Sequence, residues 1–145
     1  TRDGSDMHAR WQMMSASMQG AMAFQKGLGC VHSLSHSLGG VNPKLHHGTL
    51  NAVILPHSLA MIGNGAEEKF TRLRRALALA PTADLPQYIA DLNARIGLPP
   101  SLSAMGVREE HGWGATPYAV ADIATLSNAV PFDADKYGEL FQRAL

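Results

Sequence analysis

The chain has 145 residues, enough for one domain of ordinary size with a buried core. Hydrophobic residues make up 46% of it and charged residues 17%, a composition that excludes an intrinsically disordered chain. Twelve basic side chains balance twelve acidic ones, so no net charge attracts the chain to nucleic acid or to a membrane surface. The longest apolar run, near residues 50–62, contains Pro56 and His57 and is too short to span a bilayer.

The first predicted helix covers residues 5–24, where apolar side chains recur at helical spacing. These side chains are Met7, Trp11, Met14, Met18 and Met22. We expect this stripe to face the core, with a flexible binding groove as the alternative. A second helix is expected over residues 28–38, ended by Gly39 and Gly40.

The third predicted helix, residues 45–61, is apolar on nearly every side and is interrupted or kinked by Pro56. A helix that is apolar all round is buried, so we expect this one to be the central element. A short buried strand over residues 50–55 is the alternative. Should a neighbouring helix be missing, we expect an exposed apolar face around Val53 and Leu55.

The second half of the sequence predicts further helices. Residues 66–79 indicate a helix with a solvated, charged outer face, and the next helix is capped by Thr82 or Asp84. A polar loop is expected around His111, followed by a helix that begins at Thr116 and Pro117. Asp133 is expected to cap the last helix. With no convincing strand, the pattern predicts an all-α bundle of six or seven helices.

Residues 27–57 concentrate the chemistry of the chain. They hold five of the seven histidines, namely His32, His36, His46, His47 and His57. Burying imidazoles in an apolar stretch costs free energy unless something satisfies them, and neutral imidazole is a common metal ligand. A single histidine in such a stretch is usually one whose hydrogen bonds are satisfied within the core. Five histidines in one stretch favour a metal site instead.

The spacing of these histidines predicts how they come together. His32 and His36 are four residues apart, so they share one face of a helix. The glycines after this helix allow the next one to fold back, which brings its first turn, near His47, toward the same face. Ligands on adjacent helices in an apolar shell are typical of a catalytic metal with an open position.

Cys30 is the only cysteine, so no disulfide can form within the chain and a reducing, cytoplasmic setting is expected. Cys30 lies two residues before His32 and could be a soft metal ligand. The alternative is a small buried hydrophobic residue.

The run G-x-G-x-x-H-x-x-x-H-x-x-G-G, followed by H-H-G-T-L-N-A-V-x-L-P-H, resembles the iron-containing (group III) alcohol dehydrogenases. The resemblance is specific over residues 20–57 and looser over residues 58–145, where the segment LPPSLSAMGV also fits. It implies that His32 and His47 bind the metal, with His46 competing for the second position. It also implies that His36 acts in catalysis, near the nicotinamide and the substrate.

The resemblance implies a parent enzyme that transfers hydride between an alcohol or aldehyde and NAD or NADP. The metal is expected to be iron(II), with zinc as the alternative. The implied partners are a small-molecule alcohol or aldehyde and a second subunit in a homodimer, with no nucleic acid and no membrane.

Two parts of the family pattern do not occur in the sequence. The family completes its metal site with an Asp and a His, spaced i and i+4 on an earlier helix, and Asp3, Asp6 and His8 do not reproduce this pair. The family also has an N-terminal dinucleotide-binding domain with a glycine-rich loop. We therefore expect residues 1–145 to be a single helical metal-binding domain, a fragment that lacks both parts and is inactive alone.

Near its end the family often reads D-x-x-x-x-x-N-P-R-P, whereas here Asp122 is followed by Asn128, Ala129, Val130 and Pro131. Two other functional classes remain open at this point. One is a non-enzymatic helical module that binds metal or a partner through the histidine-rich face. The other is a purely structural helical domain.

Overall fold

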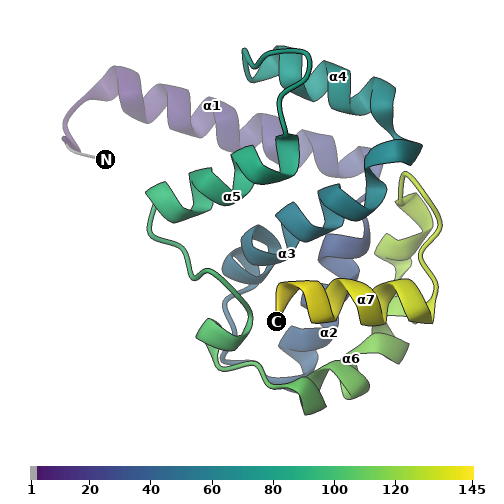
Figure 1. Ribbon diagram of the computed structural model, residues 1–145. Coiled ribbons are helices and arrows are strands. Elements are labelled where there is room, and N and C mark those ends of the chain that lie inside the picture. Colours follow the sequence, from purple (N-terminus) through teal and green to yellow (C-terminus); the bar gives the residue numbers. More distant parts are fainter. Residues whose placement is uncertain (1–2) are drawn as a thin grey trace.

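A computed structural model describes residues 3–145, which form a bundle of helices without a strand (Figure 1). Seven α-helices occur in this range: α1 (Met7–Ala23), α2 (Cys30–Val41), α3 (His47–Ile62), α4 (Glu67–Ala76), α5 (Leu85–Arg95), α6 (Glu109–Ala121) and α7 (Ala134–Ala144). Four short 3-10 segments connect them: η1 (Phe24–Lys26), η2 (Gly63–Gly65), η3 (Ser103–Met105) and η4 (Ile123–Ser127). The expected all-α bundle is confirmed. None of the described helices combines the length and apolar character needed to cross a membrane.

Helix α3 is the centre of the bundle and packs against α2, α5 and α7 (Figure 1). Leu50, Val53 and Ile54 on α3 are buried. The strand alternative for residues 50–55 is therefore wrong, because these residues lie inside α3. The expectation of an exposed apolar face here is also wrong, since Val53 is 3% exposed and Leu55 is half-buried. The packing of α5 and α2 on α3 covers this surface.

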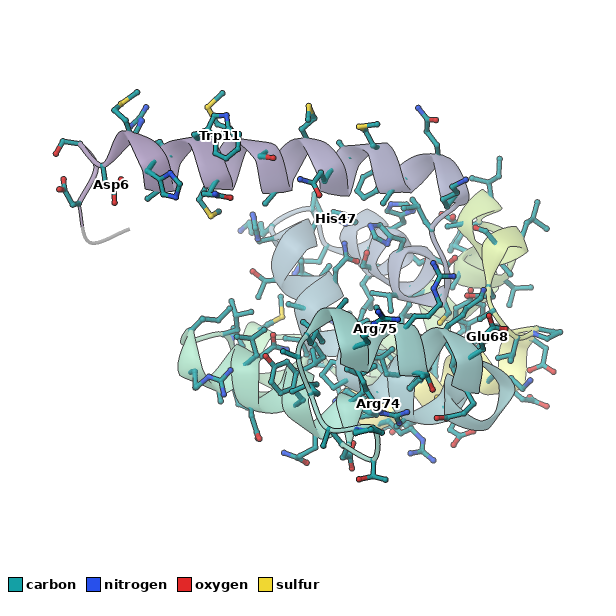
Figure 2. The ribbon with its side chains drawn as sticks, turned by 90° about the horizontal axis from the view of Figure 1, so that it is seen from above. Asp6, Trp11, His47, Glu68, Arg74 and Arg75 are labelled. Carbon is teal, nitrogen blue, oxygen red and sulfur yellow. The ribbon has the colours of Figure 1, made fainter. Side chains whose placement is uncertain are left out.

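The exposed apolar surface lies instead on α1. The expectation that its methionine stripe faces the core is wrong, because α1 has no buried residue. The side chains of the stripe, Met7, Trp11, Met14, Met18 and Met22, are 59% to 73% exposed. Figure 2 shows the N-terminal half of α1, with Asp6 and Trp11, projecting beyond the remaining helices. Helical spacing identifies an apolar face, but it does not say whether another element covers that face.

Helix α2 carries His32 and His36 and packs on α3, α6 and η4. Its N-terminus is held from the other end of the sequence, because the backbone N–H of Cys30 donates to Oδ1 of Asn128 at 2.5 Å. The Cys30 thiol is buried, contacts the Ser58 hydroxyl at 3.0 Å, and has its pKa raised mainly by that burial. Cys30 is thus a small buried side chain, as in the alternative reading of the sequence.

The C-terminal half departs from expectation at α6. This helix begins at Glu109 and contains Pro117 in its interior, so the predicted loop around His111 and the predicted helix start at Thr116 are both wrong. The carbonyl that this proline leaves without an intrahelical donor belongs to Trp113, a residue that is 75% exposed. The expected caps at Asp84 and Asp133 are confirmed, each accepting a bond from a backbone N–H of its own helix.

Candidate metal centre

Three imidazole rings from two helices lie together at the junction of α2 and α3. His32 and His36 stand one turn apart on α2, and His47 is the first residue of α3. The ring centroids are 5.8 Å apart for His32 and His36, 5.3 Å for His32 and His47, and 5.2 Å for His36 and His47. The structure therefore brings together the three histidines that the sequence singled out.

Asn51 joins two of these rings. Its side-chain amide nitrogen lies 3.2 Å from Nε2 of His32 and 3.0 Å from Nε2 of His47. The Nε2 atoms of both histidines therefore point at one place. The other amide atom of Asn51, Oδ1, is buried and has no hydrogen-bond partner among the described residues. The sequence motifs did not single out Asn51, although its position four residues after His47 places both side chains on one helix face.

His46, the competitor of His47, has a different role. It is the N-cap of α3, and its Nδ1 atom accepts a bond from the backbone N–H of Thr49 at 3.3 Å. The same atom lies 2.9 Å from the Thr49 hydroxyl. The His46 ring is thus engaged in capping the helix, whereas the His47 ring meets His32 and His36. This geometry favours His47 over His46 as a ligand.

His36 contacts a carboxylate that is distant in sequence. Its Nδ1 atom lies 3.0 Å from Oδ2 of Asp122, in the segment between α6 and η4. The other oxygen of Asp122 accepts a bond from the backbone N–H of Ala124 at 2.7 Å, which holds the carboxylate in place. The Asp122 side chain is 19% exposed and that of His36 is 41% exposed, so solvent reaches this pair mainly from the histidine side.

Both rings that point toward Asn51 favour their neutral form. Burial is the main reason that the pKa of His32 lies below its ordinary value, and the nearby His47 and His36 lower it further, against an opposing effect of Asp122. Burial likewise lowers the pKa of His47, and His36 and His46 add to this effect. Neutral imidazole is the form that binds metal ions, because its unprotonated nitrogen carries a lone pair.

These donors fit part of a metal site. Imidazole nitrogens suit iron(II) and zinc, and two of them converge on a single position here. Within residues 3–145, no group of three or more His, Cys, Asp or Glu side chains is arranged to hold a metal ion. A protein site for such an ion normally uses at least three protein ligands. The two converging nitrogens are therefore fewer donors than such a site uses.

A cavity of about 400 Å³ opens beside His32. Its walls are mostly apolar and include Phe24, Leu28, Leu55 and Leu59. The Phe24 ring packs edge-on against the His32 ring, with centroids 5.8 Å apart. A small molecule with a short carbon chain would find apolar contacts here, next to the imidazole of His32.

Comparison with known proteins identifies the family. A model described as "Fe-containing alcohol dehydrogenase family, C-terminal" matches residues 1–145. The chain is 45% identical to a 4-hydroxybutyrate dehydrogenase of Cupriavidus necator, over 100% of this chain and 40% of that protein. It is 33% identical to a 1,3-propanediol dehydrogenase of Citrobacter freundii, over 97% of this chain and 38% of that protein.

A solved structure shows the same fold. The crystal structure of a 1,3-propanediol oxidoreductase superposes with a TM-score of 0.89 and 30% identity, over 98% of this chain and 39% of that one. The chain thus spans about two fifths of the length of the curated relatives it matches. With a family match over its whole length and a shared fold, this chain belongs to the iron-containing alcohol dehydrogenases and corresponds to their C-terminal part.

Proposed function

We propose that this chain supplies metal ligands and part of the substrate pocket to a dehydrogenase that transfers hydride between an alcohol or aldehyde and NAD or NADP. The observation that carries the proposal is the convergence of Nε2 of His32 and Nε2 of His47 on one position, held in this structure by Asn51. Membership in a family of oxidoreductases supports the reaction class.

In this proposal His32 and His47 hold a divalent ion, iron(II) or zinc. Such an ion supplies Lewis-acid chemistry, which favours the alkoxide form of an alcohol and polarises the carbonyl of an aldehyde. The two histidines present neutral nitrogen donors, and their separation in sequence is bridged by the contact of α2 with α3.

His36 is the proposed catalytic residue. Because the Asp122 carboxylate can only accept a hydrogen bond, Nδ1 of His36 carries a proton and donates it to Asp122. The other ring nitrogen, Nε2, then has the lone pair and can take a proton from an alcohol or return one to it. Asp122 is the positioning residue that maintains this tautomer and the orientation of the ring.

The substrate is proposed to be a small alcohol or aldehyde. The relatives are named for 4-hydroxybutyrate, methanol and 1,3-propanediol, and the mostly apolar cavity beside His32 has room for compounds of this size. A dinucleotide-binding domain in the same polypeptide is proposed to hold the nicotinamide cofactor. This part of the proposal rests on the length of the relatives, one of which is named as NAD-dependent.

Residues 1–145 would then be a single helical domain of a larger, homodimeric enzyme. A cytoplasmic location belongs to the same proposal, because the only cysteine is a buried free thiol.

The test is to measure metal content and turnover in the full-length enzyme that contains this chain. We expect His32→Ala and His47→Ala each to abolish metal retention, because each removes a converging nitrogen. His46→Ala is the matched control, being adjacent to His47 but engaged in capping α3, and we expect it to retain metal. Stoichiometric metal in His47→Ala would contradict the ligand assignment, and a metal-loaded wild type without turnover would favour the non-enzymatic metal-binding module.

A further inference from the structure

Ser35 lies between His32 and His36 on α2, and its side chain is fully enclosed, with 1% of the residue exposed. Its hydroxyl makes two contacts. It donates to the backbone carbonyl of His32 at 3.2 Å. It also lies 3.2 Å from Nδ1 of His47. Ser35 therefore contacts Nδ1 of His47, whereas Asn51 contacts the other ring nitrogen, Nε2.

The number of protons decides the direction of these bonds. A serine hydroxyl has one proton, and a carbonyl oxygen can only accept. When the proton of Ser35 is directed to the His32 carbonyl, the contact with His47 is a hydrogen bond only if Nδ1 of His47 carries a proton and donates it. A neutral imidazole has one ring proton, so Nε2 of His47 then carries the lone pair and accepts from Asn51.

A second network is possible in principle, with the Asn51 amide turned by 180°. Nε2 of His47 would then donate to the amide oxygen, and the Ser35 hydroxyl would donate to Nδ1. Either orientation of the amide leaves one of its atoms without a partner, so Asn51 itself does not distinguish the two networks. Ser35 does, because in the second network two oxygens bearing lone pairs, Oγ of Ser35 and the His32 carbonyl, face each other at 3.2 Å with no proton between them.

We propose that Ser35 is a positioning residue that sets the tautomer of His47, placing the proton on Nδ1 and the lone pair of Nε2 toward Asn51 and the metal position. The functional meaning of this inference rests on the proposed role of His47 as a metal ligand. Groups that bind the second nitrogen of a ligating histidine orient the ring and raise its affinity for the metal. Here a buried hydroxyl has that role, supplied by the helix that carries His32.

The tautomer can be measured in the metal-free chain by nitrogen NMR of the histidine rings at about pH 8, above the ordinary imidazole pKa. We expect Nδ1 of His47 to be protonated and Nε2 to be unprotonated. In Ser35→Ala we expect a shift toward the Nε2-protonated form, which a free histidine side chain favours. Ser37→Ala is the matched control, because Ser37 is a buried serine on the same helix whose hydroxyl bonds only a backbone carbonyl, that of Ser33, among the described residues.

Three results would overturn the proposal: an Nε2-protonated His47 in the wild type, an unchanged tautomer in Ser35→Ala, or an equal shift in Ser37→Ala. Circular dichroism establishes that each variant is folded. Ser35→Thr keeps the hydroxyl, and we expect it to restore the wild-type tautomer even if the added methyl group lowers stability.

In the full-length enzyme we expect Ser35→Ala to weaken metal binding by about 10- to 100-fold, and Ser37→Ala to leave it unchanged. The role of Ser35 toward the His47 ring and the role of His47 as a metal ligand are tested separately. A Ser35-dependent tautomer combined with full metal retention in His47→Ala would leave Ser35 in its role toward the ring while refuting the proposed function of His47. A tautomer that does not depend on Ser35, combined with loss of metal in His47→Ala, would refute the role of Ser35 while supporting His47 as a metal ligand.

Discussion

Asn93 on α5 donates a 2.7 Å hydrogen bond to the backbone carbonyl of Ala52 in α3. That carbonyl would normally accept from the N–H four residues later, but the residue there is Pro56, which has none. A side chain of the neighbouring helix thus replaces the bond that the proline removes. As a result α3 runs without interruption from His47 to Ile62, and its first turns hold His47 and Asn51 beside α2.

Replacing Asn93 should therefore destabilise the fold through α3. We expect Asn93→Ala to lower the free energy of unfolding by about 1–3 kcal/mol, because it leaves a partly buried carbonyl without its donor. Pro56→Ala restores a backbone N–H to that carbonyl, so Asn93→Ala should cost less in that background. Chemical denaturation of the two single variants and the double variant measures the coupling. Strictly additive effects would mean that Asn93 stabilises the chain in some other way.

His36 and Asp122 should separate catalysis from metal binding. In the full-length enzyme we expect His36→Ala to keep its metal and to lose about 10²- to 10⁴-fold in kcat, the usual contribution of a general acid or base. Elemental analysis and steady-state kinetics on the same preparation test this. A variant with unchanged kcat at saturating substrate and cofactor would leave His36 as a packing residue.

Asp122→Asn tests the positioning role separately. The amide preserves the size of the side chain and an oxygen for the Ala124 N–H, but it removes the charge that holds the proton on Nδ1 of His36. We expect metal content to be unchanged and kcat to fall by about 10- to 100-fold. Full turnover in Asp122→Asn would show that the carboxylate only caps η4.

Stability should fall at mildly acidic pH. Burial, with Arg143 as the secondary cause, lowers the pKa of His57 in the folded chain, and burial lowers those of His32 and His47. The unfolded state then binds more protons than the folded state below the ordinary imidazole pKa of about 6.5. The contribution of these three histidines to stability is therefore complete above about pH 6.5. It decreases as the pH falls below that value and through their lowered pKa values in the folded state.

His57→Gln tests this prediction, because His57 does not belong to the group formed by His32, His36 and His47. Thermal melts of the chain between about pH 8 and pH 5 should show a shallower loss of stability for His57→Gln than for the wild type. Parallel curves for the two proteins would exclude His57 as a source of the pH dependence.

Residues 1–145 alone should fold but not catalyse. We expect no change in nicotinamide absorbance when NAD, alcohol and iron(II) are added to the purified chain, and only weak metal binding by calorimetry. Two neutral imidazoles without a carboxylate lack the negative charge that favours a divalent ion, and the described residues hold no larger ligand group. Sustained turnover, or submicromolar affinity that depends on His32 and His47, would show that the chain carries a complete site.

Much of the candidate site could be predicted because it depends on local geometry. Four residues make about one turn of a helix, so the spacing of His32 and His36 is sufficient to place them on one face. Gly39 and Gly40, which were expected to end this helix, lie inside α2, and the chain folds back only between Val41 and His47. This fold-back brings His47 to the same face. The family motif covers this same stretch, which is why the all-α fold and the three histidines were foreseen together.

The residues that support these histidines could not be predicted in the same way. Asp122 reaches His36 from 86 residues away, and Asn93 replaces a bond in α3 from another helix. Ser35 is adjacent in sequence to His36, yet its partner is the ring of His47 across the helix interface. For the same reason the methionine stripe of α1 was assigned to the core when it is exposed. The sequence by itself determined which side chains share a helix face, because backbone geometry sets their spacing, whereas only the packing of the helices decided which of those faces meet and which remain in water.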